Sequence, residues 1–211
     1  MVDINKMKLK TYKIIFIILV IAVIVVIGLI ALKYFNSYEN EQKSKQVVED
    51  FSRIIINTDS ENTSEKEEKE TITLNGYKVI GIIKIPKIGI EYPILDVNTL
   101  KPADTKEPMK YGIVKYWGGN VNDYGNLSVA GHSYYNGTMF GKTKKLEIGD
   151  IIELTDLNNQ KITYKIYDKL VIDPNDVTIL ASKDKAIREV TLITCTNGNY
   201  NRLILKAKEI L

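Results

Sequence analysis

The sequence predicts a mostly β domain preceded by one membrane-spanning helix, and three observations support this prediction. Residues 14–32 form an uninterrupted apolar stretch without a charge, and residues 59–71 contain no apolar residue at all. From Tyr77 onward, short β-rich runs alternate with turn signals such as Asn136-Gly137. We therefore expect an anchor, a polar connection and a β-barrel or β-sandwich, in that order.

The apolar stretch at 14–32 is the predicted transmembrane helix. Its nineteen residues would span about 28 Å as a helix, close to the thickness of the hydrocarbon layer of a bilayer. A cleaved signal peptide is the alternative, but its apolar core usually has only about 7–15 residues and ends at a small-residue cleavage site. The sequence KYFNSYE that follows contains no convincing site of this kind. We favour an uncleaved anchor.

The charges beside this stretch predict its orientation. Four lysines and one aspartate precede it, whereas the residues after it carry charges of both signs. Because positively charged flanks remain in the cytoplasm, residues 1–13 are predicted to be a cytoplasmic tail and the chain after about residue 33 to be extracellular. This describes a single-pass protein of the cell membrane. The net charge of +3, without a long basic run, gives no support for a nucleic-acid partner.

Residues 33–73 are predicted to be an extracellular stalk and acidic linker. Apolar residues at helical spacing, Val47, Val48 and Phe51 among them, predict a helix over residues 40–56. This helix could instead belong to the folded domain. We favour the stalk because residues 59–71, with six acidic residues and two lysines, are typical of a solvated linker.

Residues 74–211 are the predicted folded domain. Seven or eight short strands without a long helical pattern indicate an antiparallel or mixed β-barrel or sandwich. The runs DIIELTD and KITYKIYDKLVI predict one hairpin, and EVTLITC and RLILKAKEI predict a second.

The single cysteine, Cys195, ends the inner strand predicted for REVTLITC. A disulfide framework outside the cell needs an even number of cysteines, so Cys195 is either a buried small hydrophobe or a working thiol. One cysteine and one histidine also exclude a cysteine-rich zinc site and a histidine cluster. We expect no metal and no cofactor.

Two further residues could act with this thiol. His132 ends the strand predicted for NLSVAGHSYY; it is either a structural histidine or the imidazole that promotes a thiolate. Arg202, one of three arginines against 26 lysines, opens the strand predicted to pair with that of Cys195. Its guanidinium fork suits an oxyanion or a substrate carbonyl. The sequence therefore predicts a constellation of Cys195, His132 and Arg202.

These residues lie in motifs that resemble the sortases, membrane-anchored cysteine transpeptidases of Gram-positive bacteria. The resemblance rests on TLITC followed by an arginine opening the next strand, on AGH at a strand end, on MFGKTKKLEIGDIIEL and on IGIIKIPKIGIEYPI. It covers about residues 78–208 and implies an eight-stranded sortase-type β-barrel.

The resemblance also implies roles and partners. Cys195 would attack the carbonyl after Thr in an LPxTG-like sorting signal and form a thioacyl-enzyme. His132 would protonate the leaving amine and then deprotonate the incoming one. Arg202 would stabilise the oxyanion, and Thr194 would contact the substrate or the oxyanion. The implied partners are surface proteins with a C-terminal sorting signal and an amine of a cell-wall precursor.

The subclass and two other functions remain open in the sequence. We favour a class A-like or class D-like sortase, because no Asp-Pro-aromatic lid motif precedes Tyr77 and no long insertion precedes the cysteine strand. Some family members bind calcium, and Asp104 with Glu107 could serve, although a short acidic loop is usually only solvated. The alternatives are a cysteine endopeptidase with water as acceptor and a non-catalytic extracellular β-barrel binding module.

Overall fold

The computed structural model describes residues 4–58, 71–97, 102–181 and 186–210. The chain divides into two compact units, Met1–Asn40 and Glu41–Leu211. Helix α1 (Ile4–Thr58) begins in the first unit, and its part over Thr11–Ile54 is long and apolar enough to cross a membrane. The helix predicted for residues 40–56 is confirmed as part of α1. The predicted acidic linker lies mostly outside the described residues.

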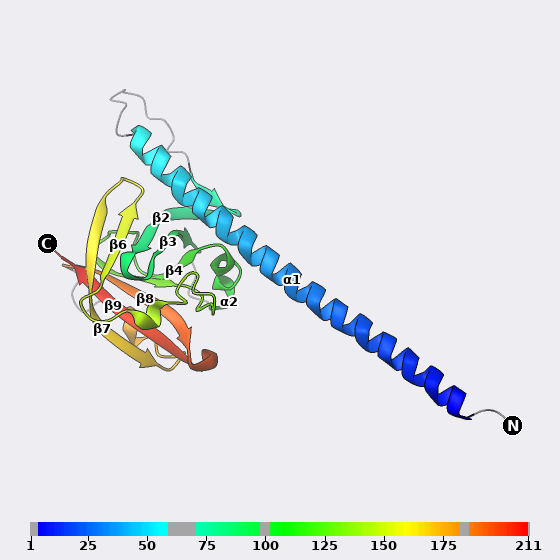
Figure 1. The fold of residues 1–211 in the computed structure, drawn as a ribbon. Helices are drawn as coiled ribbons and strands as arrows, with labels where there is room; N and C mark the ends of the chain where they lie inside the picture. Colours follow the sequence, from blue (N-terminus) through cyan, green and yellow to red (C-terminus); the bar gives the residue numbers. More distant parts are fainter. Residues whose placement is uncertain (1–3, 59–70, 98–101, 182–185, 211) are drawn as a thin grey trace. The chain divides into compact units, whose positions relative to one another are not determined.

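The second unit contains a closed β-barrel of eight strands, so the barrel is confirmed over the sandwich. Figure 1 labels most of these strands. Neighbouring strands follow the order β2-β3-β4-β5-β8-β9-β7-β6, and β2 pairs with β6 to close the ring. A short strand, β1, extends the edge at β2. The strands are β1 (Thr73–Leu74), β2 (Tyr77–Ile85), β3 (Ile90–Asp96), β4 (Ile113–Trp117), β5 (Gly125–Ala130), β6 (Ile151–Asp156), β7 (Lys161–Ile172), β8 (Arg188–Thr196) and β9 (Asn201–Glu209).

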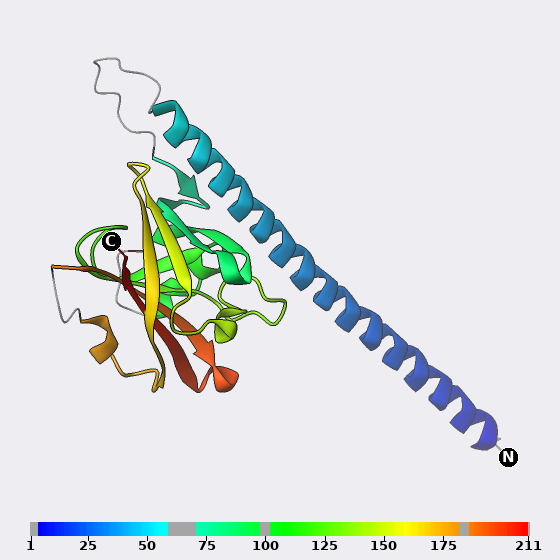
Figure 2. The ribbon, with the colours of Figure 1, turned by 60° about the vertical axis from the view of Figure 1, so that its left-hand side comes forward.

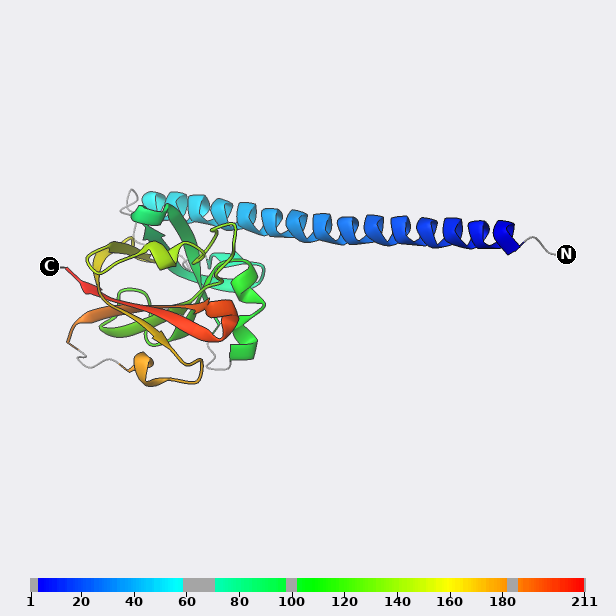
Figure 3. The same ribbon diagram turned by 60° about the horizontal axis from the view of Figure 1, so that its bottom comes forward.

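Short helices occupy the connections. These are η1 (Pro86–Ile88), α2 (Pro102–Thr105), η2 (Pro108–Lys110), η3 (Thr143–Lys145), η4 (Thr178–Leu180) and η5 (Asn197–Asn199). Both predicted hairpins are confirmed. Figure 2 shows the β6–β7 hairpin in yellow, and Figure 3 shows β8 and β9 in orange to red, joined through η5.

Side chains alternate between the two faces of each strand, and this alternation produces two apolar clusters. The interior cluster fills the barrel and includes Val129 and Leu192. The outer cluster includes their chain neighbours Ala130 and Ile193. Ala130 pairs directly with Ile193, and Val129 with Leu192, so the two clusters lie on opposite faces of the β5–β8 pair.

The helical residues of the second unit pack onto the outer cluster. Phe51 is 2% exposed within it, and Val47 and Val48 pack against it. Burying an aromatic side chain of this size contributes roughly 1.5–3 kcal/mol to folding. This packing supports the alternative in which the helix belongs to the folded unit. The domain boundaries at residues 33 and 74 stay predictions.

Candidate active site

Cys195 and Arg202 lie directly opposite each other on adjacent strands. Cys195 is the last but one residue of β8, and its antiparallel partner on β9 is Arg202. Residues paired in this way place their side chains on the same face, with Cβ atoms about 4.5–5.5 Å apart. The predicted neighbourhood of thiol and guanidinium is therefore present. The thiol is free and partly exposed rather than fully buried.

His132 reaches the same level from the other side of β8. The parallel β5–β8 register joins Ala130 to Ile193, a separation of 63 residues. One residue further, the amide of Gly131 donates to the carbonyl of Ile193 at 3.1 Å. The register ends at the pair of Ala130 and Ile193, and if it continued for two residues beyond Ala130 it would bring His132 level with Cys195. We call His132, Cys195 and Arg202 the Cys195 row; the alternation of the strands puts it on the outer face of the barrel.

Thr194 fastens β8 to the residue before His132. Its hydroxyl donates to the Gly131 carbonyl at 2.7 Å, and the residue is 5% exposed. Gly131 itself has no space for a side chain, because a Cβ there would lie 2.6 Å from Ile113 and 2.8 Å from Phe140. Close packing on one side and a hydrogen bond on the other therefore fix the backbone that enters His132.

The environment of His132 favours its neutral form. Burial lowers the pKa of the imidazole below its ordinary value near 6.5, and the positive charge of Lys110 lowers it further. The ring contacts that of Tyr134, with centroids 4.9 Å apart and planes inclined by 42°. An imidazole held neutral near pH 7 is suited to accept a proton.

Lys110 of η2, whose charge acts on His132, forms an ion pair with Glu107. Its ammonium lies 2.6 Å from the carboxylate of Glu107, which also accepts a hydrogen bond from the hydroxyl of Tyr111 at 3.1 Å. Glu107 is one of the two acidic residues, with Asp104, that could bind calcium according to the sequence. Among the described residues, no group of three or more potential metal-ligating side chains comes together.

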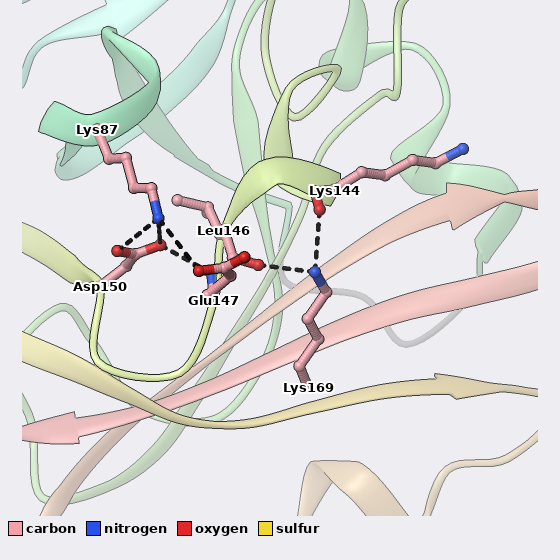
Figure 4. Close-up of polar contacts among 6 residues, drawn as sticks. All are labelled: Lys87, Lys144, Leu146, Glu147, Asp150 and Lys169. Carbon is pink, nitrogen blue, oxygen red and sulfur yellow. Dashed lines mark hydrogen bonds and ion pairs between the residues drawn. The ribbon is translucent and has the colours of Figure 1, made fainter.

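The chain that leads from His132 to β6 is held by a lysine of β7. Figure 4 shows the Lys169 ammonium donating to two main-chain carbonyls, that of Lys144 at 2.9 Å and that of Leu146 at 2.7 Å. Carbonyls at the end of a short helix have no partner within the helix. A charged donor satisfies two of them here and fixes the end of η3 against the barrel.

A second lysine fixes the turn just before β6. The ammonium of Lys87 contacts both carboxylate oxygens of Asp150, at 2.7 and 2.9 Å (Figure 4). The same carboxylate accepts a hydrogen bond from the amide of Glu147 at 2.7 Å. The segment after His132 is therefore tied to η1 as well as to β7.

Sequence reasoning did not select Lys110 or Tyr134 as residues of this site. Tyr134 had a signal, because it follows His132 by two residues in AGHSYY. Lys110 had none, because it is 22 positions away in a lysine-rich chain and only the folded barrel brings its charge close enough to act on His132.

Comparison with known proteins agrees with this fold. A scan against protein families matches residues 83–210 to the family described as Sortase domain. Sortase A of Bacillus anthracis is 25% identical over 182 residues, which cover 82% of each chain. Among solved structures, a Clostridium perfringens sortase D5 transpeptidase is 29% identical, with a TM-score of 0.62, and the match covers 81% of this chain and 99% of that one.

A further solved structure shares the fold. It is Clostridium perfringens sortase C with the C-terminal cell wall sorting motif, at 21% identity and a TM-score of 0.54, with 79% of this chain and 89% of that chain covered. Fold and matches together define a closed β-barrel of the kind found in cysteine transpeptidases. Since the family match covers more than half of the residues, the chain belongs to the sortase family.

Proposed function

We propose that this protein is a transpeptidase that cleaves an LPxTG-like sorting signal and joins the released acyl group to an amine of a cell-wall precursor. One observation carries the proposal. It is the direct pairing of Cys195 with Arg202, together with the parallel β5–β8 register that ends two residues before His132 and Cys195, which supports a nucleophile, an oxyanion donor and a proton carrier at one level of the barrel. Membership of the sortase family supports the choice of substrate.

In the first half-reaction, the thiolate of Cys195, in molecules whose His132 is protonated, attacks the carbonyl carbon of Thr in the sorting signal. The tetrahedral intermediate collapses by breaking its C–N bond, and the leaving amine takes a proton from His132. The product is a thioester to Cys195. In the second half-reaction, an incoming amine attacks the thioester, gives its proton to His132 and releases the thiolate. The covalent intermediate divides one difficult exchange into two easier ones.

Arg202 is the proposed oxyanion donor, because its side chain lies on the face of Cys195 and guanidinium keeps its charge. Thr194 is retained as a contact to the substrate or the oxyanion. Its hydroxyl already donates to Gly131, so we expect the smaller contribution from it. The lowered pKa of His132 means that few molecules hold the imidazolium at neutral pH, and a strong preformed ion pair with the thiolate is not required.

The remaining assignments are part of the same proposal. The apolar helix would anchor the protein once in the cell membrane, with residues 1–13 in the cytoplasm and the barrel outside. The substrates would be surface proteins with a C-terminal sorting signal. The match to a sortase A and to a sortase D5 supports a class A-like or class D-like enzyme.

The decisive experiment uses the full chain in detergent, with LPxTG-like and scrambled peptides, in the presence and absence of an amine acceptor. We expect a peptide–amine product from the wild type and none from Cys195→Ala. Since the chain has one cysteine, mass spectrometry of the trapped acyl-enzyme locates the adduct without ambiguity. Activity that survives Cys195→Ala would refute the proposal.

Two other outcomes identify the alternatives. Hydrolysis that an amine acceptor does not divert would indicate an endopeptidase. A thiol that reacts with alkylating reagents only after denaturation, with no turnover of any peptide, would indicate a non-catalytic binding module.

A further inference from the structure

We propose that Tyr92 and Glu41 are positioning residues for His132: the Tyr92 hydroxyl holds the turn that follows the histidine, and Glu41 holds that hydroxyl. The proposal rests on the proposed function for its kinetic part. It assigns a role to the helical segment beside the barrel, nine residues after the apolar stretch.

The turn in question, residues 131–140, is called the His132 turn. It closes on itself, because the amide of Phe140 donates to the His132 carbonyl at 3.0 Å and Ser133 bridges to Met139. The position of His132 is therefore coupled directly to that of Met139 and Phe140. A displacement at the far end of this turn is transmitted to the histidine backbone.

Met139 is held in a costly conformation. Its φ of +48° lies in the left-handed region, and its side chain is 3% exposed. A residue with a Cβ loses roughly 1–2 kcal/mol there, so the surrounding contacts must impose the conformation. One of these contacts is a hydrogen bond of 3.0 Å from the Met139 amide to the hydroxyl of Tyr92.

Glu41 determines how that hydroxyl can act. The Tyr92 oxygen lies 2.7 and 2.8 Å from the two carboxylate oxygens of Glu41. A phenol has one proton, and its donation to the carboxylate leaves the oxygen lone pairs available for the amide of Met139. Burial raises the pKa of the Tyr92 phenol and the carboxylate raises it further, so the hydroxyl stays protonated.

The helix that carries this carboxylate packs on the barrel. Glu41 lies on the same helix as Phe51, and Phe51 is buried in the outer cluster together with Ala130 and Ile193. Those two residues precede His132 and Cys195 by two positions each. Hence the helical segment packs on the outer face of the barrel, and through Glu41 and the Tyr92 hydroxyl it is linked to the turn that follows the histidine.

The first test is independent of activity. The chain contains one histidine, so an NMR spectrum of the full chain in detergent, labelled at the imidazole, reports His132 alone. We expect Tyr92→Phe to shift and broaden this signal and to raise the pKa of His132 toward its ordinary value, because a looser turn admits water. The groups that act on the imidazole are Lys110 of η2 through its charge and Tyr134 of the turn through its ring, with Cys195 on the adjacent strand β8; Tyr92→Phe replaces none of them.

Tyr167→Phe is the matched control. It also removes one tyrosine hydroxyl bonded to a carboxylate, that of Glu189 at 2.8 Å. Glu189 lies near the start of β8. It is six residues from Cys195, a separation of about 20 Å along a strand. We expect this variant to leave the histidine signal and its pKa unchanged.

The second test is kinetic. If the turn positions the proton carrier, Tyr92→Phe lowers kcat by about tenfold and changes KM by less than about twofold. Glu41→Ala should lower kcat by about threefold, whereas Glu41→Gln, which keeps an acceptor, should stay within about twofold of the wild type. Adding Glu41→Ala to Tyr92→Phe should cost nothing more, because Glu41 acts through the hydroxyl.

The results separate this proposal from the proposed function. An unchanged histidine signal in Tyr92→Phe, recorded well below the thermal midpoint of the variant so that it is folded, would overturn the positioning role whatever the activity. Additive effects in the double variant would overturn the role of Glu41. If the wild type shows no transpeptidation, the NMR arm still decides whether Tyr92 positions His132.

Discussion

The two ends of the β8–β9 hairpin each carry an arginine, and the arginines have different surroundings. At the open end, Arg188 contacts the carboxylate of Glu209 at 2.9 Å, donates to the Asn122 carbonyl at 2.7 Å and lies 3.9 Å from the centre of the Tyr124 ring. At the turn end, Arg202 lies opposite Cys195 and donates to the adjacent Asn201 carbonyl at 3.2 Å.

The difference agrees with the proposed division into a structural arginine and a catalytic one. The contacts of Arg188 join β8, β9 and the loop that carries Asn122. Arg202 is beside a partly exposed thiol on the same face of the sheet. Arg188 and Cys195 are about 23 Å apart along β8, so one hairpin can hold the barrel together at one end and present reactive groups at the other.

The largest effect should come from replacing Arg202 by alanine, and Arg188→Ala is the matched comparison. We expect Arg202→Ala to lower kcat/KM by about 10²–10³-fold, because it removes a charged donor from the developing oxyanion. Arg188→Ala should change kcat/KM by less than about threefold when assayed at a temperature where it is folded. Peptide transfer kinetics measure both, and equal losses in the two variants would break the comparison.

Arg202→Lys sharpens the same point. A lysine keeps the charge but loses the planar fork, so partial recovery relative to Arg202→Ala separates charge from geometry. Full recovery would show that the fork is not needed.

The next effect concerns stability at the open end. Asn122 is 6% exposed with a φ of +66°; its amide donates to the Gln160 carbonyl at 2.7 Å and its oxygen accepts from the Tyr164 hydroxyl at 3.0 Å. We expect Asn122→Ala to lower the free energy of unfolding by about 2–4 kcal/mol, since the buried Tyr164 hydroxyl loses its partner, the Gln160 carbonyl loses one of its two bonds and alanine is strained there.

Asn122→Gly is the control for the backbone. Glycine accepts the left-handed conformation, so it should be less destabilising than alanine by about 1 kcal/mol. Urea unfolding measures both values. A loss of kcat/KM comparable with that of Arg202→Ala would contradict the separation of the two ends.

The smallest effect concerns the charge near His132. Removing Lys110 by Lys110→Gln should raise the pKa of His132, and Glu107→Gln, which leaves the lysine without its counter-charge, should lower it. NMR titration of the single histidine measures both. Lys161→Gln, which removes another lysine paired with a glutamate, should leave the pKa of His132 unchanged.

The sign for stability follows from the lowered pKa. Below pH about 6.5 the unfolded chain binds a proton at the histidine more readily than the folded chain, so stability falls as the pH falls through the folded pKa. Lys110→Gln should reduce the fall in the free energy of unfolding between neutral and acidic pH. A larger fall than in the wild type would contradict the electrostatic explanation.

Local patterns predicted the parts of the fold that depend on neighbours in sequence. The alternation in DIIELTD and KITYKIYDKLVI predicted the β6–β7 hairpin, and a six-residue loop between two apolar runs predicted that Cys195 and Arg202 face each other. Helical spacing of Val47 and Phe51 predicted a helix over residues 40–56, but no local pattern shows which surface covers those residues.

What could not be predicted depends on contacts between distant segments. Nothing near His132 or Cys195 specifies the parallel β5–β8 register that joins their strands. Tyr92 occurs in an apolar run and Glu41 in a polar helix, so neither sequence indicates a buried hydroxyl bonded to a carboxylate 51 positions away. The left-handed Met139 has no glycine or asparagine to signal it.

The β5–β8 register also has a consequence for how such a barrel diversifies. A ladder of main-chain hydrogen bonds keeps two residues side by side whatever the length of chain that connects them. The connections between β6, β7 and β8 can therefore change in length or sequence without displacing His132 from Cys195, provided that these strands and the His132 turn are kept. New peptide preferences can then evolve in those connections while the chemistry is inherited unchanged.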